Sequence, residues 1–278
     1  MSVAIRAATP QECARLWPEV RVEHLFPDAK AFKEYCRSDA WRVRTTERGE
    51  AAILGPWREH LAVLAIRTLW SSERSVPDFV ADAVVCAHGH GFGRVLSPLL
   101  PDVLLGGYRS AGMRTAEPIV AIQGHPELVM WADAPIGVRI RAGRPSDLSA
   151  VSAIDEACFE EFWRYGEREL AGLLGAERLA VAQASGGAVI GYTLTTVSRG
   201  SATLSRLATA PHARNYGVGR ALLAESAAWA LRNGAVTYSL CTQEANSASR
   251  RLYASAGLTE LAERYAFAIC DVAKGVRA

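Results

Sequence analysis

The stretch Leu204-Ser-Arg-Leu-Ala-Thr-Ala-Pro-His-Ala-Arg-Asn-Tyr-Gly-Val-Gly-Arg-Ala-Leu-Leu223 decides the fold of this chain. Residues 202–209 are largely apolar or β-branched, which predicts a buried strand, and Pro211 ends it because proline cannot donate to a strand ladder. From Val218 onward apolar residues recur at helical spacing, so we expect a helix that ends near Gly234. The sequence therefore predicts a strand, a glycine-bearing loop and a helix, in that order.

The loop between this strand and this helix has the pattern Arg214-x-x-Gly217-x-Gly219. Its two glycines let the backbone pass close to a ligand, and the free N–H groups of the first helical turn favour an anion. Arg214 and Arg220 add cationic donors that suit phosphate. We interpret the loop as a cradle for a diphosphate; the alternative is a turn whose glycines serve geometry alone.

This loop resembles the acyl-CoA-binding loop of the GNAT acetyltransferase superfamily, whose pattern is Gln or Arg, two residues, Gly, any residue, then Gly or Ala. A second motif follows an expected strand over 236–242. It runs Asn246-Ser-Ala-Ser-Arg-Arg-Leu-Tyr-Ala-Ser-Ala-Gly-Leu258 and resembles the family's Asn-x-x-Ala-x-x-Leu-Tyr-x-x-x-Gly-Phe helix. Ser249 replaces the usual Ala and Leu258 the usual Phe. The resemblance covers roughly residues 138–272.

The resemblance implies acetyl-CoA as cosubstrate, no metal, and Tyr253 as the catalytic residue that protonates the leaving thiolate. A phenol, with an ordinary pKa of about 10, suits that role. The alternative is a core tyrosine, as expected for Tyr108 in the first half of the chain. By resemblance, the cofactor-binding residues are Leu207, Ala208, Thr209, Arg214, Asn215, Tyr216, Gly217, Val218, Gly219, Arg220, Asn246, Ser249 and Tyr253.

The general base and the acceptor pocket stay open at this stage. Some family members carry a glutamate on the strand before the loop, but this strand has no carboxylate. The candidates for the base are an ordered water, Glu160, Glu161 or Glu244. Aromatic residues between 157 and 169 can line an acceptor pocket, or they can be core residues of one amphipathic helix. These aromatic residues are Phe159, Phe162, Trp163 and Tyr165.

Two pairs of similar segments predict a tandem repeat. Ile5-Arg-Ala7 matches Ile140-Arg-Ala142, and Tyr108-Arg-Ser-Ala-Gly-Met113 matches Tyr253-Ala-Ser-Ala-Gly-Leu258. We therefore expect an α/β fold, of the mixed α+β kind, with two tandem GNAT-like domains, each a mixed β-sheet flanked by helices. The expected division is 1–125 for a degenerate domain, 126–137 for a linker and 138–278 for the catalytic domain.

The first copy lacks the chemistry of the loop. Its corresponding segment is Ser71-Ser-Glu-Arg-Ser-Val-Pro77. No glycine allows close backbone approach, Glu73 opposes an anion, and Pro77 removes an N–H donor. We expect that only the second copy binds CoA.

Composition limits the other possibilities. The 278 residues carry a net charge of +2 without a basic tract, which argues against a nucleic-acid partner. No signal-like or membrane-spanning apolar run occurs, and six scattered cysteines favour reduced thiols in a cytoplasmic protein. His88-Gly-His90 indicates a helix end rather than a metal site. We expect a monomer or a homodimer.

The resemblance implies an N-acetyltransferase that acts on a primary amine of a small molecule or peptide by direct attack on the thioester. The alternative is a non-catalytic acyl-CoA-binding or regulatory protein. A nicotinamide or flavin enzyme is disfavoured, because no complete G-x-G-x-x-G follows a first strand and no parallel βαβ run is expected around Gly217.

Overall fold

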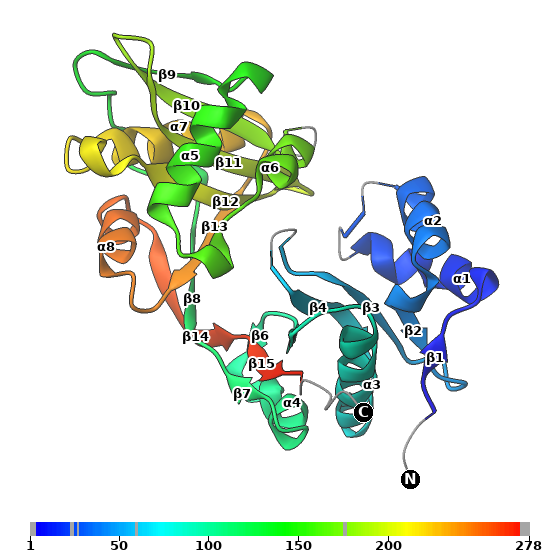
Figure 1. The fold of residues 1–278 in the computed structure, drawn as a ribbon. Helices are drawn as coiled ribbons and strands as arrows, with labels where there is room; N and C mark the ends of the chain where they lie inside the picture. Colours follow the sequence, from blue (N-terminus) through cyan, green and yellow to red (C-terminus); the bar gives the residue numbers. More distant parts are fainter. Residues whose placement is uncertain (1–3, 23–24, 27, 59–60, 175–176, 273–278) are drawn as a thin grey trace. The chain divides into compact units, whose positions relative to one another are not determined.

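The computed structural model describes residues 4–22, 25–26, 28–58, 61–174 and 177–272 (Figure 1). The chain divides into two compact units. The first comprises Met1–Glu117 together with Tyr265–Ala278, and the second comprises Pro118–Arg264. Each unit has a mixed β-sheet flanked by helices, as expected for two tandem GNAT-like domains.

The first unit is built on one sheet and four α-helices. Its strands run in the order β1 (Arg6–Ala7), β2 (Val43–Thr45), β3 (Ala51–Pro56), β4 (Val63–Trp70), β5 (Arg94–Leu96), β15 (Ala268–Asp271) and β7 (Arg114–Thr115). Its helices are α1 (Pro10–Val22), α2 (Ala29–Ser38), α3 (Val76–Gly89) and α4 (Gly106–Ser110). The buried face of α3 packs against β4, which supplies the main core of this unit.

The second unit holds the candidate site. Its strands run in the order β14 (Thr259–Ala266), β8 (Ile119–Gly124), β13 (Thr237–Gln243), β12 (Ser201–Thr209), β11 (Val189–Ser198), β10 (Arg178–Ala184) and β9 (Val138–Ala142). The last residues of β14, Tyr265 and Ala266, belong to the first unit and pair there with β6 (Leu100–Pro101). The helices are α5 (Leu148–Cys158), α6 (Glu167–Leu173), α7 (Val218–Arg232) and α8 (Ser247–Ser255).

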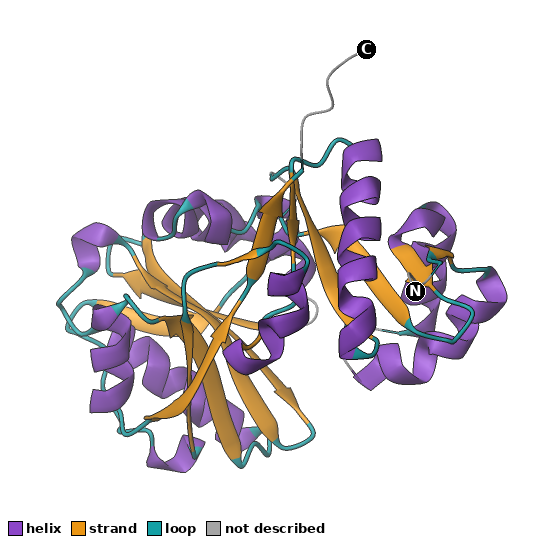
Figure 2. Cartoon of the chain, turned by 90° about the horizontal axis from the view of Figure 1, so that it is seen from below, coloured by secondary structure: helices purple, strands orange, loops and turns teal. Residues whose placement is uncertain are grey.

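Helices cover both faces of the second sheet (Figures 1 and 2). Two neighbouring residues of β11 show which helix lies on which face. A Cβ on Gly191 would lie 3.0 Å from Leu222 of α7, whereas the next residue, Tyr192, donates a hydrogen bond to Asp155 of α5. Because side chains alternate along a strand, α5 and α7 pack on opposite faces.

The two halves of the sequence exchange one strand each. β8 continues from the first half of the sequence, yet it pairs with β13 of the second unit from Ile119 with Gln243 to Gly124 with Tyr238. β15, near the end of the chain, pairs with β5 and β7 of the first unit. Each sheet is therefore completed by a strand from the other half of the sequence.

This exchange moves the boundaries away from the expected 1–125, 126–137 and 138–278. The segment 126–137 is part of the second unit: it contains a 3₁₀ turn at Pro126–Leu128, and the Met130 amide donates to the Ala256 carbonyl at 3.1 Å. Backbone pairing of the exchanged strands thus places the boundaries at 117/118 and 264/265.

Two local expectations need correction. β12, α7 and β13 do form a parallel βαβ unit around the glycine loop, because β12 and β13 pair in parallel. The proposed single helix over 157–169 does not form: α5 ends at Cys158, a 3₁₀ turn covers Glu161–Trp163, and α6 begins at Glu167.

Candidate functional site

The edge where β12 leaves β13 is the first feature of the candidate site. The two strands pair in parallel only through Ser201–Thr203 with Thr237–Ser239, although both continue beyond these residues. A β-bulge at Ser205 shifts the register with β11 just after this pairing ends. Among the described strands, none pairs with the edge of β12 over residues 205–209.

Alternation along β12 decides which backbone amides face that open edge. The amide of Ala210 donates to the carbonyl of Ile190 on β11 at 2.9 Å. Because successive amides of a strand point to opposite sides, the amide of Ala208 also faces β11, and those of Leu207 and Thr209 face the open edge. Two of the three predicted strand residues therefore present an N–H group there.

The loop after β12 ends in an uncapped helix start. Asn215 and Gly217 both have positive φ, +67° and +84°, and Gly217 caps α7 without a side-chain hydrogen bond. The first backbone bond into α7 runs from the Ala221 amide to the Gly217 carbonyl at 3.0 Å. The amides of residues 218–220 precede it and have no partner within the helix, so they can bind an anion.

One buried hydroxyl lies beside this helix start. The Thr209 Oγ1 is buried and has no hydrogen-bond partner among the described residues. It lies 3.4 Å from the position that a Cβ on Gly219 would take. Because residue 219 is glycine, the end of β12 can lie close to the first turn of α7. The unpaired Thr209 Oγ1 lies between these two elements.

The two arginines of the motif lie on different sides of the loop. The exposed Arg214 folds back on the end of β12, where its Nε donates to the Thr209 carbonyl at 3.3 Å and its Nη2 to Cys158 Sγ at 3.4 Å. Arg220 reaches the last turn of α8, where its Nη2 donates to Ser255 Oγ at 2.9 Å. Each guanidinium group is therefore held by an element next to the loop, Arg214 by the end of β12 and Arg220 by α8.

The predicted residues of α8 have structural partners. Asn246 caps the helix, since its Oδ1 accepts from the Ser249 amide and its Nδ2 donates to Thr242 Oγ1, both at 3.2 Å. Tyr253 is only 6% exposed and packs in the core with Leu223 and other residues. Burial raises the pKa of the Tyr253 phenol to about 12, while a hydrogen bond with the Ser249 hydroxyl opposes this shift.

The aromatic segment after α5 is fixed by one buried arginine of β12. The Arg206 guanidinium carbon lies 3.8 Å from the ring centre of Phe159 and 4.2 Å from that of Tyr165. Its Nη2 also donates to the Trp163 carbonyl. The bulge at Ser205 leads to this arrangement, because it changes the face on which the following side chains lie.

A buried carboxylate compensates the charge of Arg206. Asp155 of α5 is fully buried and accepts from Arg206 Nε at 2.9 Å, from the Tyr165 amide at 2.8 Å and from the Tyr192 hydroxyl. The phenol of Tyr192 has its pKa raised, first by burial and then by the negative charge of Asp155. The network connects α5, β11, β12 and the segment 159–165. Its two charged groups, Arg206 and Asp155, pair with each other.

The carboxylates that we considered for the general base differ in their surroundings. Glu244 accepts from Arg264 Nε at 2.7 Å, and Glu160 and Glu161 are exposed. A further carboxylate, Glu177, stands directly before β10. Burial raises its pKa, and the side chain of the bulge residue Ser205 opposes this shift. No feature of the sequence around Glu177 distinguishes it, because its surroundings arise from strands that are distant in the chain.

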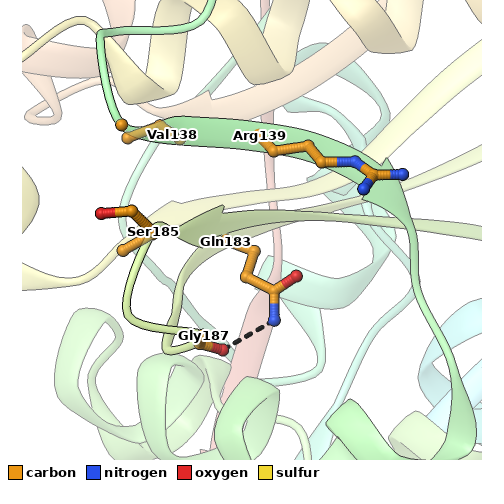
Figure 3. Close-up of a pocket in the computed structure, with 7 residues that line it drawn as sticks. Val138, Arg139, Gln183, Ser185 and Gly187 are labelled. Carbon is orange, nitrogen blue, oxygen red and sulfur yellow. Dashed lines mark hydrogen bonds between the residues drawn. The ribbon is translucent and has the colours of Figure 1, made fainter.

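A surface pocket lies elsewhere on this unit. It has a volume of about 420 Å³ and is formed by β9 and the turn between β10 and β11. Figure 3 shows Arg139 and Gln183 along it, with Gln183 Nε2 donating to the Gly187 carbonyl at 2.7 Å. None of the predicted site residues lines this pocket.

In the part of the chain that the structure describes, no group of three histidine, cysteine or acidic side chains is arranged to hold a metal ion. No helix within the same residues combines the length and the apolar character needed to span a membrane. At His88-Gly-His90, α3 ends at Gly89 and His90 is its C-cap, as the sequence predicted.

Part of the second unit resembles a known protein family. Residues 148–258 match the model of the acetyltransferase (GNAT) family, which spans α5 to the end of α8. The search of curated proteins gave no match.

Solved structures match the whole chain in fold. A tandem GNAT protein from the clavulanic acid biosynthesis pathway superposes with a TM-score of 0.69 at 14% identity, covering 99% of this chain and 100% of that one. A GCN5-related N-acetyltransferase from Sphaerobacter thermophilus superposes with a TM-score of 0.63 at 18% identity, and the match covers 98% of this chain and 96% of that one. A GCN5-related N-acetyltransferase from Kribbella flavida superposes with a TM-score of 0.59 at 13% identity, and the match covers 82% of this chain and 88% of that one. At these identities the likeness shows the tandem GNAT fold.

Proposed function

Because residues 148–258 form a GNAT-family domain within a tandem GNAT fold, we propose that the protein transfers an acetyl group from acetyl-CoA to a primary amine of a small molecule or peptide. The reaction is a direct attack of the amine on the thioester, without a covalent enzyme intermediate. The protein acts in the cytoplasm as a monomer or homodimer, and only its second unit binds acetyl-CoA.

One observation carries this proposal. The uncapped amides of residues 218–220 and the unpaired edge of β12 meet at the same loop, Arg214–Gly217. The first can bind a diphosphate, and the second can pair with the amide groups of a pantetheine arm. A CoA thioester carries both groups on one extended molecule, so a single ligand satisfies both features.

The proposed roles follow from this placement. The amides of residues 218–220, with Arg214 and Arg220, hold the diphosphate. The amides of Leu207 and Thr209 orient the pantetheine arm and polarise the acetyl carbonyl as negative charge develops on its oxygen. Tyr253 donates a proton to the departing sulfur.

The burial of Tyr253 favours the alternative function. A phenol in the core with its pKa raised to about 12 is a weaker acid than free tyrosine, as expected in a protein that binds an acyl-CoA without turning it over. In that case the protein is a non-catalytic acyl-CoA-binding or regulatory protein.

Release of CoA thiol from acetyl-CoA decides between these functions. The full chain is mixed with acetyl-CoA and a panel of primary amines, and free thiol is measured with a disulfide reagent. Amine-dependent release supports the transferase. Acetyl-CoA binding by calorimetry without any release supports the binding protein, and the absence of binding removes both.

A further inference from the structure

Glu177 is a carboxylate that the fold buries without satisfying it. Its Oε2 is buried and has no hydrogen-bond partner among the described residues. Burial raises the pKa of this carboxyl, and the side chain of Ser205 lowers it. Burying an ionised carboxylate is costly unless it is paired. A group of this kind in a native fold needs an explanation outside stability.

The charged groups on the neighbouring elements do not compensate it. Arg178, the next residue, donates to Glu225 at 2.6 Å and 2.7 Å. Arg206 on β12 is paired with Asp155, and Glu169 on α6 accepts from a backbone amide. Burial accordingly raises the pKa of Glu177, and only the side chain of Ser205 lowers it.

A second carboxylate in the chain shows what a satisfied site looks like. Glu50 also has one buried oxygen without a partner, but its other oxygen accepts from both the amide and the hydroxyl of Ser72, at 2.9 Å and 3.0 Å. These hydrogen bonds lower the pKa of Glu50. The pKa shifts of the two groups therefore have opposite directions: the pKa is lowered for Glu50 and raised for Glu177.

The partner of Glu177 fixes its place in the site. Ser205 is the bulge residue of β12, next to the point where pairing with β13 ends. Two residues further along, the amide of Leu207 faces the open edge that the proposed function assigns to the acetyl-bearing end of the cofactor. The carboxylate therefore lies beside the strand along which the thioester is proposed to bind.

We propose that Glu177 is the general base that removes the proton from the acceptor ammonium. This inference rests on the proposed function and names its missing catalytic group. The ammonium gives one proton to Glu177 Oε2, and the neutral nitrogen then forms a bond to the acetyl carbon. The carbon–sulfur bond breaks, and sulfur keeps the electron pair and takes a proton from Tyr253. The second nitrogen proton passes through water to the Tyr253 phenolate, which restores the phenol. Glu177 finally returns its proton to water.

The test compares Glu177→Gln with Glu167→Gln in the full chain. Glu167 is an exposed carboxylate in the first turn of α6 and serves as the matched control. The probes are benzylamine, which is mostly protonated at pH 7, and hydroxylamine, which is mostly neutral. We expect Glu177→Gln to lower kcat/KM for benzylamine about 100-fold and to affect hydroxylamine much less, because a base contributes roughly 100-fold or more. Glu167→Gln should match the wild type with both.

Two further readouts separate catalysis from structure. Glu177→Gln removes a buried charge, so its Tm should equal or exceed that of the wild type while activity falls. The acidic limb of the benzylamine pH profile should also disappear. Equal kcat/KM and an unchanged pH profile in Glu177→Gln would overturn the proposal, as would a parallel loss with both probes.

A spectroscopic arm applies even where turnover with these probes is slow. In protein labelled with ¹³C at glutamate carboxyls, the signal lost in Glu177→Gln identifies this group. Its pKa should lie above that of the other glutamates and should shift when acetyl-CoA is added. An ordinary pKa, or one that acetyl-CoA leaves unchanged, contradicts the role. If calorimetry shows no acetyl-CoA binding to the wild type, the proposed function itself fails, which is a distinct result.

Discussion

The two units share a backbone design and differ at the start of one helix. In the first unit β4 pairs in parallel with β5 only through Val63–Ala65, and a bulge at Arg67 follows. In the second unit β12 pairs with β13 only through Ser201–Thr203, and a bulge at Ser205 follows. The same strand geometry is therefore present in both copies, and the proposed difference in CoA binding depends on the loop that follows.

The loop of the first unit is filled by the protein's own groups. The Ser72 amide already donates to the Glu50 carboxylate, and Pro77 removes a donor at the start of α3. A Cβ on Gly107 would lie 2.8 Å from Val76 Cβ, which shows that α4 packs directly on the first turn of α3. In the second unit the corresponding helices α7 and α8 are connected by the hydrogen bond from Arg220 to Ser255. The two copies therefore differ in a few side chains at this loop and not in the fold, and we propose that these side chains decide which copy holds an anion.

The largest expected effect concerns the exchanged strands. A fragment of residues 138–278 keeps the second copy of the repeat but lacks β8, which lies between β13 and β14 in the sheet. We expect it to show no cooperative unfolding transition, because the interior of its sheet is missing. A fragment of residues 118–264 contains the whole second unit and should unfold cooperatively. Cooperative unfolding of 138–278 would show that the exchange is dispensable.

The tyrosines at matching positions provide the next test. Tyr253→Phe should leave acetyl-CoA affinity near that of the wild type and lower turnover about 100-fold, because a general acid contributes roughly that factor. Tyr108→Phe, in the first unit, should lower turnover little. Because the pKa of Tyr253 is raised to about 12, this group stays protonated up to about pH 11, so no basic limb below that pH should depend on it. Unchanged turnover in Tyr253→Phe would remove its role.

A single carboxylate should make the second loop resemble the first. The first unit carries Glu73 and Asp78 at the start of α3. Gly219→Asp places a carboxylate in the first turn of α7, where the nearest atoms lie 3.4 Å or more from a Cβ. We expect acetyl-CoA affinity to fall about 30-fold, or roughly 2 kcal/mol, and Gly219→Asn to lose less. If calorimetry shows the same loss of acetyl-CoA affinity in Gly219→Asp and Gly219→Asn, the effect comes from the size of the side chain and not from its charge.

The smallest effect is expected from the exposed arginine. Arg220→Gln should weaken acetyl-CoA binding about fivefold at low salt, because a solvent-exposed charge contributes on the order of 1 kcal/mol and is screened by ions. The loss should shrink as salt is raised. A control on the first unit, Arg74→Gln, should leave affinity unchanged. A salt-independent loss in Arg220→Gln would indicate that its bond to Ser255, and not its charge, matters.

Local sequence patterns predicted the parts of the fold that depend on neighbouring residues. Pro211 and Gly217 marked the loop, and the helix from Val218 formed as expected. Each of these features is determined by backbone propensities within a few residues. The tandem organisation followed from matching segments in the two halves.

Features that depend on partners distant in the chain were not predicted. β8 and β15 are short strands, and nothing in them shows that each pairs with strands from the other half of the sequence. The break after Cys158 arises because Arg206, on a distant strand, fixes the aromatic segment that follows. The unpaired oxygen of Glu177 likewise results from tertiary packing, which periodicity does not reveal.

Calorimetric titration of the full chain with acetyl-CoA tests most directly whether only one copy binds. The account predicts one molecule bound per chain and a strong loss of affinity in Gly219→Asp, with wild-type affinity in the matching first-unit variant Glu73→Gln. Two molecules per chain, or an affinity that responds to Glu73→Gln and not to Gly219→Asp, would contradict it.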